Sequence, residues 1–218
     1  CLVTLELTGI TVSFNSAPLE WWLSLPIIVI YPLLFGWVSY QTATKLAEHK
    51  RRLQVMSTRD GMTGVYNRRH WETMLRNEFD NCRRHNRDAT LLIIDIDHFK
   101  SINDTWGHDV GDEAIVALTR QLQITLRGSD VIGRFGGDEF AVIMSGTPAE
   151  SAITAMLRVH EGLNTLRLPN TPQVTLRISV GGAPLNPQMS HYREWLKSAD
   201  LALYKAKKAG RNRTEVAA

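Results

Sequence analysis

The sequence predicts an α/β fold, an α+β sandwich with a βαββαβ core, preceded by a transmembrane helix. Three observations support this prediction. Apolar runs of strand length alternate with helical patterns after residue 69, a Gly-Gly pair separates two strand patterns at 131–145, and residues 21–40 carry no charge. These features divide the chain into a membrane segment at 1–44, a linker or stalk helix at 45–57 and a folded domain at 58–218.

The uncharged run at 21–40 has the length and composition of a membrane span. About 20 apolar residues match the hydrocarbon thickness of a bilayer. Aromatic residues near both ends fit interfacial belts, and prolines are tolerated in spans that pack against neighbours. These residues are Trp21, Trp22, Pro26, Pro32, Trp37 and Tyr40. The competing interpretation, a buried helix of a soluble protein, fits this length less well.

Basic residues follow this run directly, at Lys45, Lys50, Arg51 and Arg52. The positive-inside rule therefore predicts that the folded domain lies in the cytoplasm. The apolar stripe of the 45–57 segment is too short to predict a coiled coil. Because the chain starts with Cys1 rather than Met, we expect it to be a fragment of a longer membrane or sensory protein.

The domain is expected to alternate helices and strands in a regular order. Apolar residues that recur every three or four positions predict helices, and short apolar runs predict strands. The expected elements are a helix at 69–85, a strand at 89–95, a helix at 109–127, the hairpin at 131–145, a helix at 149–165, a strand at 174–183 and a helix at 191–209. With the first helix set aside, this order is the ferredoxin-like βαββαβ signature.

The hairpin carries two adjacent carboxylates at its tip. Asp138 and Glu139 directly follow Gly136 and Gly137, and glycine backbone can turn tightly and approach a ligand closely. Acids beside bare backbone suit a hard cation such as Mg²⁺ that carries a nucleotide phosphate. The alternative is an ordinary hairpin with solvated acids, since Gly and Asp are common turn residues.

A second polar cluster follows the strand at 89–95. Asp95 and Asp97 stand at its carboxyl end, close to the hairpin tip if the two strands are neighbours. Asn103 and Asp112 come next, and an amide together with a carboxylate can read the donors and the acceptor of guanine. The alternative is that Asn103 and Asp112 cap turns and helices.

Cations gather near the end of the last predicted helix. Lys207 and Arg211 lie four positions apart, so they point in a similar direction if the last helical turn includes both. As a point charge and a planar fork, they suit the oxygens of a triphosphate. The alternative is that they only complement the helix dipole.

Four segments in this order resemble the motifs of GGDEF-domain diguanylate cyclases of the membrane-anchored bacterial type. The segments are Asp60-Gly-Met-Thr-Gly-Val-Tyr-Asn-Arg-Arg69, Asp95-Ile-Asp97-His-Phe-Lys100-Ser-Ile-Asn103-Asp, Gly136-Gly-Asp-Glu-Phe140, and Asp200-Leu-Ala-Leu-Tyr204 with Gly210-Arg211-Asn212. The resemblance covers about residues 57–215. It implies a palm-like fold similar to nucleotide polymerases and adenylyl cyclases, attached to the bacterial inner membrane with the catalytic domain in the cytoplasm.

The resemblance also implies a reaction and a role for each motif residue. Two GTP molecules would be condensed into cyclic di-GMP and two pyrophosphates, with two Mg²⁺ ions per site or Mn²⁺ in their place. Asp95, Asp138 and the Ile96 carbonyl would hold metal. Asp138 and Glu139 are the expected catalytic residues, and Glu139 would help to deprotonate the ribose 3′-OH. The expected substrate-binding residues are Asn103 and Asp112 for guanine, and His98, Phe99, Lys100, Lys207 and Arg211 for phosphate.

Two further expectations concern assembly and regulation. One such site holds one GTP, so two domains must face each other in a closed homodimer. The resemblance implies an inhibitory site for the product at Arg127 and Asp130, because Arg can contact guanine O6 and N7 and Asp can accept from its N–H groups. Arg158 is expected as a further contact, although a solvated helical face explains it equally well.

Composition is consistent with this assignment but does not decide it. The net charge of +3 comes without a dense basic patch, which argues against a nucleic-acid polymer as partner. Cys1 and Cys82 have neither zinc-site spacing nor a disulfide framework.

Two other functions are alternatives to an active cyclase. One is a catalytically inactive GGDEF receptor or scaffold that binds GTP or cyclic di-GMP, and the other is a cyclase for different nucleotides. The intact acids Asp95, Asp138 and Glu139 favour an active enzyme, and the intact pair Asn103 and Asp112 favours guanine.

Overall fold

The computed structural model describes residues 4–7, 10–13, 30–46, 58–171 and 173–217. The chain forms two compact units, Cys1–Ser57 and Thr58–Ala218, and each is described by itself.

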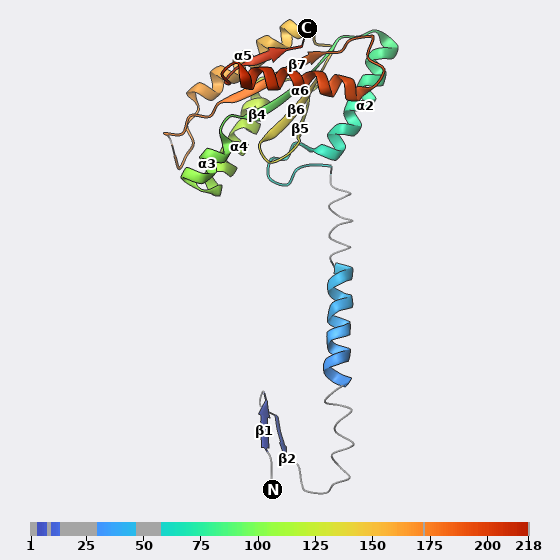
Figure 1. Cartoon of the computed structure of the whole chain (residues 1–218), viewed down its shortest axis with the longest axis vertical. Coiled ribbons are helices and arrows are strands. Elements are labelled where there is room, and N and C mark those ends of the chain that lie inside the picture. Colours follow the sequence, from blue (N-terminus) through green and yellow to red (C-terminus); the bar gives the residue numbers. More distant parts are fainter. Residues whose placement is uncertain (1–3, 8–9, 14–29, 47–57, 172, 218) are drawn as a thin grey trace. The chain divides into compact units, whose positions relative to one another are not determined.

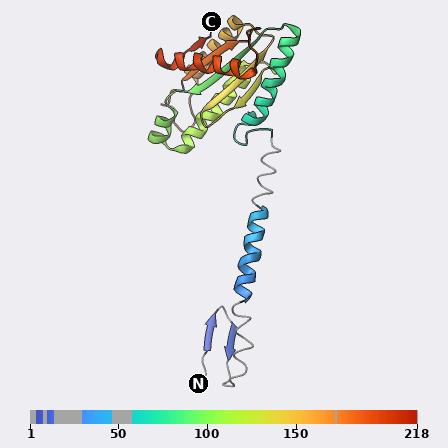
Figure 2. The ribbon, with the colours of Figure 1, turned by 45° about the vertical axis from the view of Figure 1, so that its right-hand side comes forward.

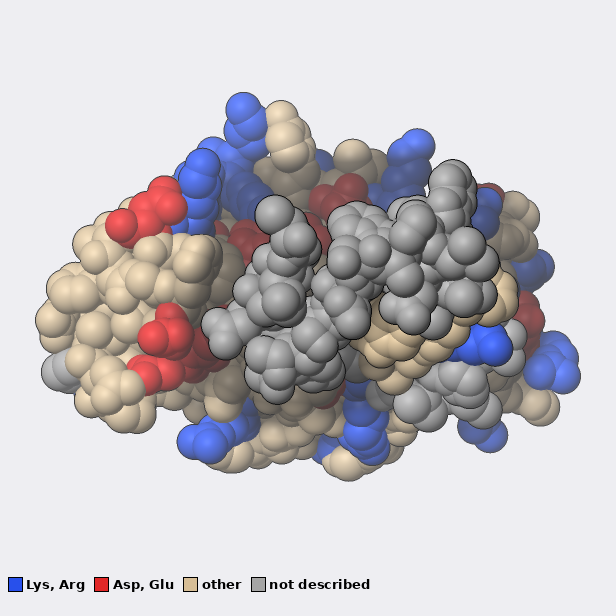
Figure 3. All heavy atoms as spheres, turned by 90° about the horizontal axis from the view of Figure 1, so that it is seen from below, with Lys and Arg blue, Asp and Glu red and all other residues tan. Residues whose placement is uncertain are grey.

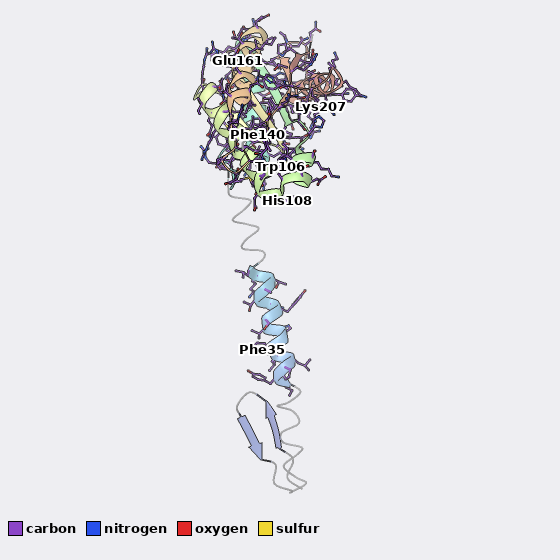
Figure 4. The ribbon with its side chains drawn as sticks, turned by 90° about the vertical axis from the view of Figure 1, so that its left-hand side faces the viewer. Phe35, Trp106, His108, Phe140, Glu161 and Lys207 are labelled. Carbon is purple, nitrogen blue, oxygen red and sulfur yellow. The ribbon has the colours of Figure 1, made fainter. Side chains whose placement is uncertain are left out.

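The first unit contains a short hairpin and a helix. Strands β1 (Thr4–Leu7) and β2 (Ile10–Ser13) pair antiparallel, and residues 30–46 are helical. Large apolar side chains along this helix are exposed, and Phe35 projects from it in Figure 4. Across the ranges described above, no helix is both long enough and apolar enough to cross a bilayer.

The predicted transmembrane helix at 21–40 is therefore not supported by the structure. Residues 21–29 of that prediction lie outside the described residues, as do residues 47–57 of the predicted stalk helix.

The second unit is built on a mixed sheet of six strands in the order β3-β5-β6-β4-β7-β8. The strands are β3 (Tyr66–Asn67), β4 (Ala89–Ile96), β5 (Val131–Arg134), β6 (Glu139–Ser145), β7 (Ile178–Pro184) and β8 (Thr214–Val216). The four central strands pair antiparallel, whereas β3 and β8 add to the edges in parallel. The order β5-β6-β4-β7 confirms the predicted ferredoxin-like core.

Helices cover both faces of this sheet (Figures 1 and 2). They are α2 (Arg68–His85), α3 (Phe99–Trp106), α4 (His108–Thr125), α5 (Ala149–Thr165) and α6 (Tyr192–Lys208). Helices α2 and α6 pack on one face and α4 and α5 on the other, so that alternate residues of β4 belong to two separate apolar clusters. Figure 4 shows Phe140, which is fully buried, inside the domain.

The sequence analysis missed three short elements. The edge strands β3 and β8 are too short to produce an alternating pattern, and α3 has only eight residues, of which Phe99 and Ile102 pack partly buried against the core. The strand expected at 174–183 starts at Ile178, and the helix expected at 191–209 ends at Lys208.

Gly181 on β7 determines how closely α6 approaches the sheet. A Cβ atom there would lie 2.1 Å from the Leu203 backbone nitrogen and 2.2 Å from the Ala199 carbonyl oxygen. Glycine therefore allows the α6 backbone to rest directly on β7. This contact brings the end of α6, with Lys207, to the carboxyl end of β4.

Candidate functional site

The carboxyl end of β4 meets the tip of the β5–β6 hairpin, as the sequence predicts. Asp95 on β4 is paired in register with Glu139 on β6, and residues directly opposite in an antiparallel pair lie on the same face. Asp95 is 9% exposed and Glu139 is half-buried. The Ile96 amide donates to the Asp138 carbonyl over 3.3 Å. The four residues expected at the metal and catalytic positions are therefore gathered at one point.

Lys207 on α6 contributes a cation to this acidic cluster. Its Nζ lies 2.7 Å from Asp95 Oδ2, and its side chain is 33% exposed. Figure 4 shows Lys207 on the side of the domain formed by α6. In this structure Lys207 pairs with Asp95, whereas the sequence analysis assigned it to phosphate. A lysine that neutralises a carboxylate and reaches solvent can serve both partners in turn.

The acids at this site carry more negative charge than their surroundings neutralise. Burial raises the pKa of Asp95, Lys207 opposes that shift, and the nearby Asp138 adds to it. Burial and then repulsion from Asp95 raise the pKa of Glu139, again against Lys207. Crowded carboxylates whose charged forms are disfavoured provide a favourable place for a divalent cation.

The residues present fit a magnesium ion that completes its shell with other ligands. Within the described ranges, no three His, Cys, Asp or Glu side chains are grouped so that they could hold a metal ion. The predicted set consists of two carboxylates, Asp95 and Asp138, and the Ile96 carbonyl. Mg²⁺ commonly binds through one or two carboxylates and takes its remaining ligands from phosphate oxygens and water.

The start of α3 lies next to this cluster. His98, with φ 58°, forms its N-cap without a side-chain hydrogen bond, and Phe99 and Lys100 begin the helix. The first amides of a helix have no intrahelical acceptor and carry the positive end of its dipole. The predicted phosphate-binding residues His98, Phe99 and Lys100 are therefore placed where an anion is favoured.

The two predicted guanine readers lie on the neighbouring helices α3 and α4. Neither helix has a side-chain cap, so the interpretation of Asn103 and Asp112 as caps is wrong. Gly111, which precedes the exposed Asp112, packs against Asn103, because a Cβ on Gly111 would lie 1.9 Å from Asn103 Oδ1. That oxygen is buried and has no hydrogen-bond partner among the described residues. A buried acceptor without a partner suits a donor on a ligand, such as a guanine N–H.

Arg211 lies beyond the end of α6. The helix ends at Lys208, and Arg211 has a left-handed φ of 62°. The last helical turn therefore includes Lys207 but not Arg211, so the condition under which the two side chains were predicted to point in a similar direction is not met. Arg211 is exposed in the loop between α6 and β8, and the path of that loop decides where its guanidinium can reach.

Arg134 and Asp60 hold the hairpin tip, and the sequence analysis assigned neither of them to the site. Arg134 donates to the Gly137 carbonyl from Nη2 over 2.8 Å and from Nε over 3.2 Å. Its Nη1 lies 3.2 Å from Asp60 Oδ1. Arg134 and Asp60 each lie in or next to a motif. They are 74 positions apart, however, so no local sequence pattern indicates their contact.

A hollow of about 560 Å³ opens beside Glu139, between α2 and α6. Charged and aromatic side chains line it, including Arg68, Arg76, Phe135 and Lys197. Glu139 therefore lines space that a ligand or a second domain could enter.

The three residues of the predicted inhibitory site line one separate hollow of about 210 Å³, namely Arg127, Asp130 and Arg158. Asp130 Oδ2 accepts a hydrogen bond from the Arg127 amide over 3.0 Å, while Oδ1 is buried with no partner among the described residues. Burial raises the pKa of Asp130. Two arginines and one acid thus contribute to the lining of this hollow.

Charge on the described surface is mixed. On the face shown in Figure 3, lysine and arginine side chains are spread around the edge, with acidic side chains between them. That no nucleic-acid polymer is a partner stays a prediction.

Comparisons with known proteins agree with this geometry. The family model described as "Diguanylate cyclase, GGDEF domain" matches residues 57–213. Diguanylate cyclase DosC of Escherichia coli strain K12 is 35% identical over 159 residues, which cover 72% of this chain and 34% of DosC. Cyclic di-GMP phosphodiesterase NbdA of Pseudomonas aeruginosa is 30% identical over 193 residues, which cover 83% of this chain and 25% of NbdA.

Solved structures show the same fold. The crystal structure of the GGDEF domain of DgcB from Caulobacter crescentus, in complex with c-di-GMP, aligns with a TM-score of 0.70 at 30% identity. The alignment covers 73% of this chain and 93% of that domain. The chain spans about a third of DosC and a quarter of NbdA, so the relatives contain further segments that it does not match.

Proposed function

The chain belongs to the GGDEF family of diguanylate cyclases, and from this premise we propose that it is an active cyclase. It condenses two GTP molecules into cyclic di-GMP and releases two pyrophosphates. The observation that carries this proposal is the pairing of Asp95 with Glu139 at the carboxyl end of β4, with Asp138 and Lys207 beside them.

The acidic cluster performs the metal-binding and proton-transfer roles. Asp95, Asp138 and the Ile96 carbonyl would hold Mg²⁺, which would supply Lewis-acid chemistry and lower the pKa of the attacking hydroxyl. Glu139 accepts the proton of the ribose 3′-OH, a role that suits a carboxylate whose pKa is raised. The 3′-oxygen then attacks the α-phosphorus of the second GTP, and the bond to the pyrophosphate oxygen breaks.

Residues around this cluster bind and orient the nucleotide. The first amides of α3, at His98 and Phe99, and the Lys100 side chain take phosphate oxygens. Lys207, which pairs with Asp95 in this structure, would together with Arg211 neutralise the triphosphate. Asn103 Oδ1 and the carboxylate of Asp112 accept from the guanine N–H groups.

Two copies are required, because each site holds one GTP and the product joins two. We propose a homodimer in which two such sites face each other around a two-fold axis. The hollow beside Glu139 gives the second nucleotide access to the carboxylate.

The hollow lined by Arg127, Asp130 and Arg158 is proposed as the product's inhibitory site. Its two guanidiniums can contact O6 and N7 of guanine, and Asp130 Oδ1 can accept from its N–H groups.

The second candidate function is a receptor that binds GTP or cyclic di-GMP without turnover. The similarity to a phosphodiesterase, NbdA, favours this candidate, because it shows that a related sequence occurs in a protein named for the opposite reaction. The intact acidic cluster supports catalysis more strongly.

We also propose that the chain is located at the bacterial inner membrane, with the catalytic domain in the cytoplasm. The uncharged run, and the basic residues that follow it, support this location. Recovery of the expressed chain in the soluble fraction, rather than in salt-washed membranes, would contradict it.

The test of the proposed function compares two glutamate variants. Glu139→Gln removes the proton acceptor while keeping the size of the side chain, and it should reduce cyclic di-GMP formation at least about 100-fold. Glu161→Gln, on the exposed side of α5 (Figure 4), is the matched control and should retain full activity. Equal activity of the two variants would remove Glu139 from the mechanism. GTP binding without any product in the unsubstituted chain would favour the receptor.

A further inference from the structure

Asp97 lies two residues after the metal-site Asp95, yet its carboxylate is used inside the domain. It is 6% exposed. Oδ1 accepts a hydrogen bond from Ser179 Oγ on β7 over 2.6 Å, and Oδ2 accepts from the backbone amide of Asn212 over 2.9 Å. Both oxygens are therefore engaged by protein donors.

The donor at Asn212 belongs to an unusual stretch of backbone. Gly210, Arg211 and Asn212 have successive φ values of 111°, 62° and 47°, a conformation that residues with a side chain adopt infrequently. Such conformations persist only where neighbouring contacts impose them. The Arg211 amide donates to the Ala206 carbonyl over 3.0 Å, and the next bond along the loop is the one to Asp97.

Further contacts fix the loop on both sides of Asn212. The Val180 amide donates to the Arg213 carbonyl over 2.9 Å, which attaches the loop to β7. Beyond Arg213, Thr214 Oγ1 lies 3.2 Å from His160 Nε2 on α5. Among these contacts, the bond to Asp97 is the one that joins the loop to the end of β4, where the acidic cluster lies.

We propose that Asp97 is a positioning residue that acts through Arg211. By holding the Asn212 amide it keeps the loop left-handed, and this backbone path directs the exposed Arg211 side chain toward nucleotide phosphates bound at Asp95. The inference rests on the proposed function for the role of Arg211. Asp95 and Asp97 thus have different roles. Asp95 lies at the reaction site, and Asp97 positions a phosphate-binding loop.

The first experiment compares Asp97→Ala with Asp97→Asn in the full chain. Alanine removes the acceptor, so the KM for GTP should rise about tenfold while kcat stays within about twofold. Asparagine keeps one oxygen acceptor for the Asn212 amide and can donate to Ser179 Oγ, so it should restore most of the affinity. A loss confined to kcat would overturn the proposal.

A double-mutant cycle tests whether Asp97 acts through Arg211. Asp97→Ala should add little to the effect of Arg211→Ala, because residues that act as one unit are not additive. If the two losses in KM multiply, the proposal is wrong.

A second pair of variants leaves the buried Asp97 unchanged, so this test does not depend on whether the Asp97→Ala variant folds. Asn212 is exposed. Asn212→Val should raise the KM as Asp97→Ala does, because a β-branched residue disfavours positive φ. Asn212→Gly removes the same side chain but tolerates this φ, so its KM should stay within about twofold of the unsubstituted chain. Equal values for the two variants would contradict the proposal.

Amide hydrogen exchange separates this inference from the proposed function. Asp97→Ala should speed exchange at residues 211–213 more than elsewhere in the domain, whether or not the chain turns over GTP. Unchanged exchange there would overturn the positioning role. Failure of the unsubstituted chain to form product would instead count against the proposed function.

Discussion

At the scale of one residue, the raised pKa of Glu139 suits a proton acceptor but lowers the stability of the fold at neutral pH. Burial and repulsion from Asp95 raise its pKa. A carboxyl group whose pKa is raised in the folded state stabilises the fold below its unfolded pKa, and this contribution is lost as the pH rises through the folded pKa. At neutral pH the charged form of Glu139 is therefore a local source of instability.

Glu139→Gln should stabilise the metal-free protein at pH 7 to 8. Because Glu139 is only half-buried, the gain should stay below about 1 kcal/mol, or roughly 2–4 °C in Tm at most. Differential scanning calorimetry with a chelator measures it. Glu161→Gln should leave the Tm unchanged, and a lower Tm for Glu139→Gln would contradict the assigned repulsion.

Gly111→Ala should weaken GTP binding without touching the acidic cluster. The added methyl group would displace Asn103, whose Oδ1 lies 1.9 Å from the Cβ position. We expect the KM for GTP to rise roughly tenfold, since a misplaced acceptor loses one hydrogen bond to the base. Gly61→Ala, where a Cβ would meet nothing within 4 Å, is the control. Similar KM values for both variants would count against Asn103 as a guanine reader.

The site residues that were predicted from the sequence and those that were missed differ in how far along the chain their partners lie. Asp138 and Glu139 were predicted because the hairpin pattern and the acids are contiguous. The tie between Asp97 and Asn212 spans 115 positions, and that between Arg134 and Asp60 spans 74. Only the folded sheet brings such pairs together, so no local periodicity indicates them.

At the scale of elements, the β5–β6 hairpin is held by the ion pair between Arg134 and Asp60, which lies in the segment before β3. Although burial raises the pKa of Asp60, hydrogen bonds from Thr63 and Arg134 lower it overall. A lowered carboxyl pKa contributes stability that is present above the unfolded pKa and is lost as the pH falls through the folded pKa.

Asp60→Asn should therefore destabilise the domain at pH 7 by about 1 kcal/mol. The difference from the unsubstituted chain should shrink as the pH falls to about 2, because the Asp60 carboxyl is protonated only as the pH drops through its lowered folded pKa. Urea unfolding at the two pH values measures it, with the exposed Asp80→Asn as control. A difference that persists unchanged at low pH would rule out the ionic contribution.

Substitutions in the hollow between the end of α4 and α5 should change inhibition by the product but not the rate of turnover. Arg127→Ala and Arg158→Ala should each leave the initial rate within about twofold and weaken inhibition by cyclic di-GMP about tenfold or more, because each removes a guanidinium that reads guanine. Progress curves with added product measure this. The exposed Arg87→Ala is the control, and unchanged inhibition in Arg158→Ala would leave that residue as part of a solvated helical face.

The elements that the sequence predicted best are those with long apolar faces, such as α5 at Ala149–Thr165. Helix α3 was missed because it has only eight residues and none of them is fully buried. Since α3 carries Asn103 and begins at the predicted phosphate-binding residues, the site's geometry was less predictable than its residue types.

At the scale of the whole molecule, the proposed reaction needs two domains. In the proposed mechanism the acids, the guanine readers and the phosphate-binding loop bind one nucleotide, so formation of a cyclic dinucleotide would depend on a second copy. The segment before residue 58 forms a unit of its own. Any segment or ligand that brings two copies together would determine the rate of product formation.

The most direct test is to incubate the purified chain with GTP and Mg²⁺ while measuring cyclic di-GMP, pyrophosphate and protein concentration together. The account predicts two pyrophosphates per cyclic di-GMP, and a rate per chain that rises with protein concentration until the dimer is saturated. GTP binding with neither product at any protein concentration, including when two chains are covalently linked, would contradict it.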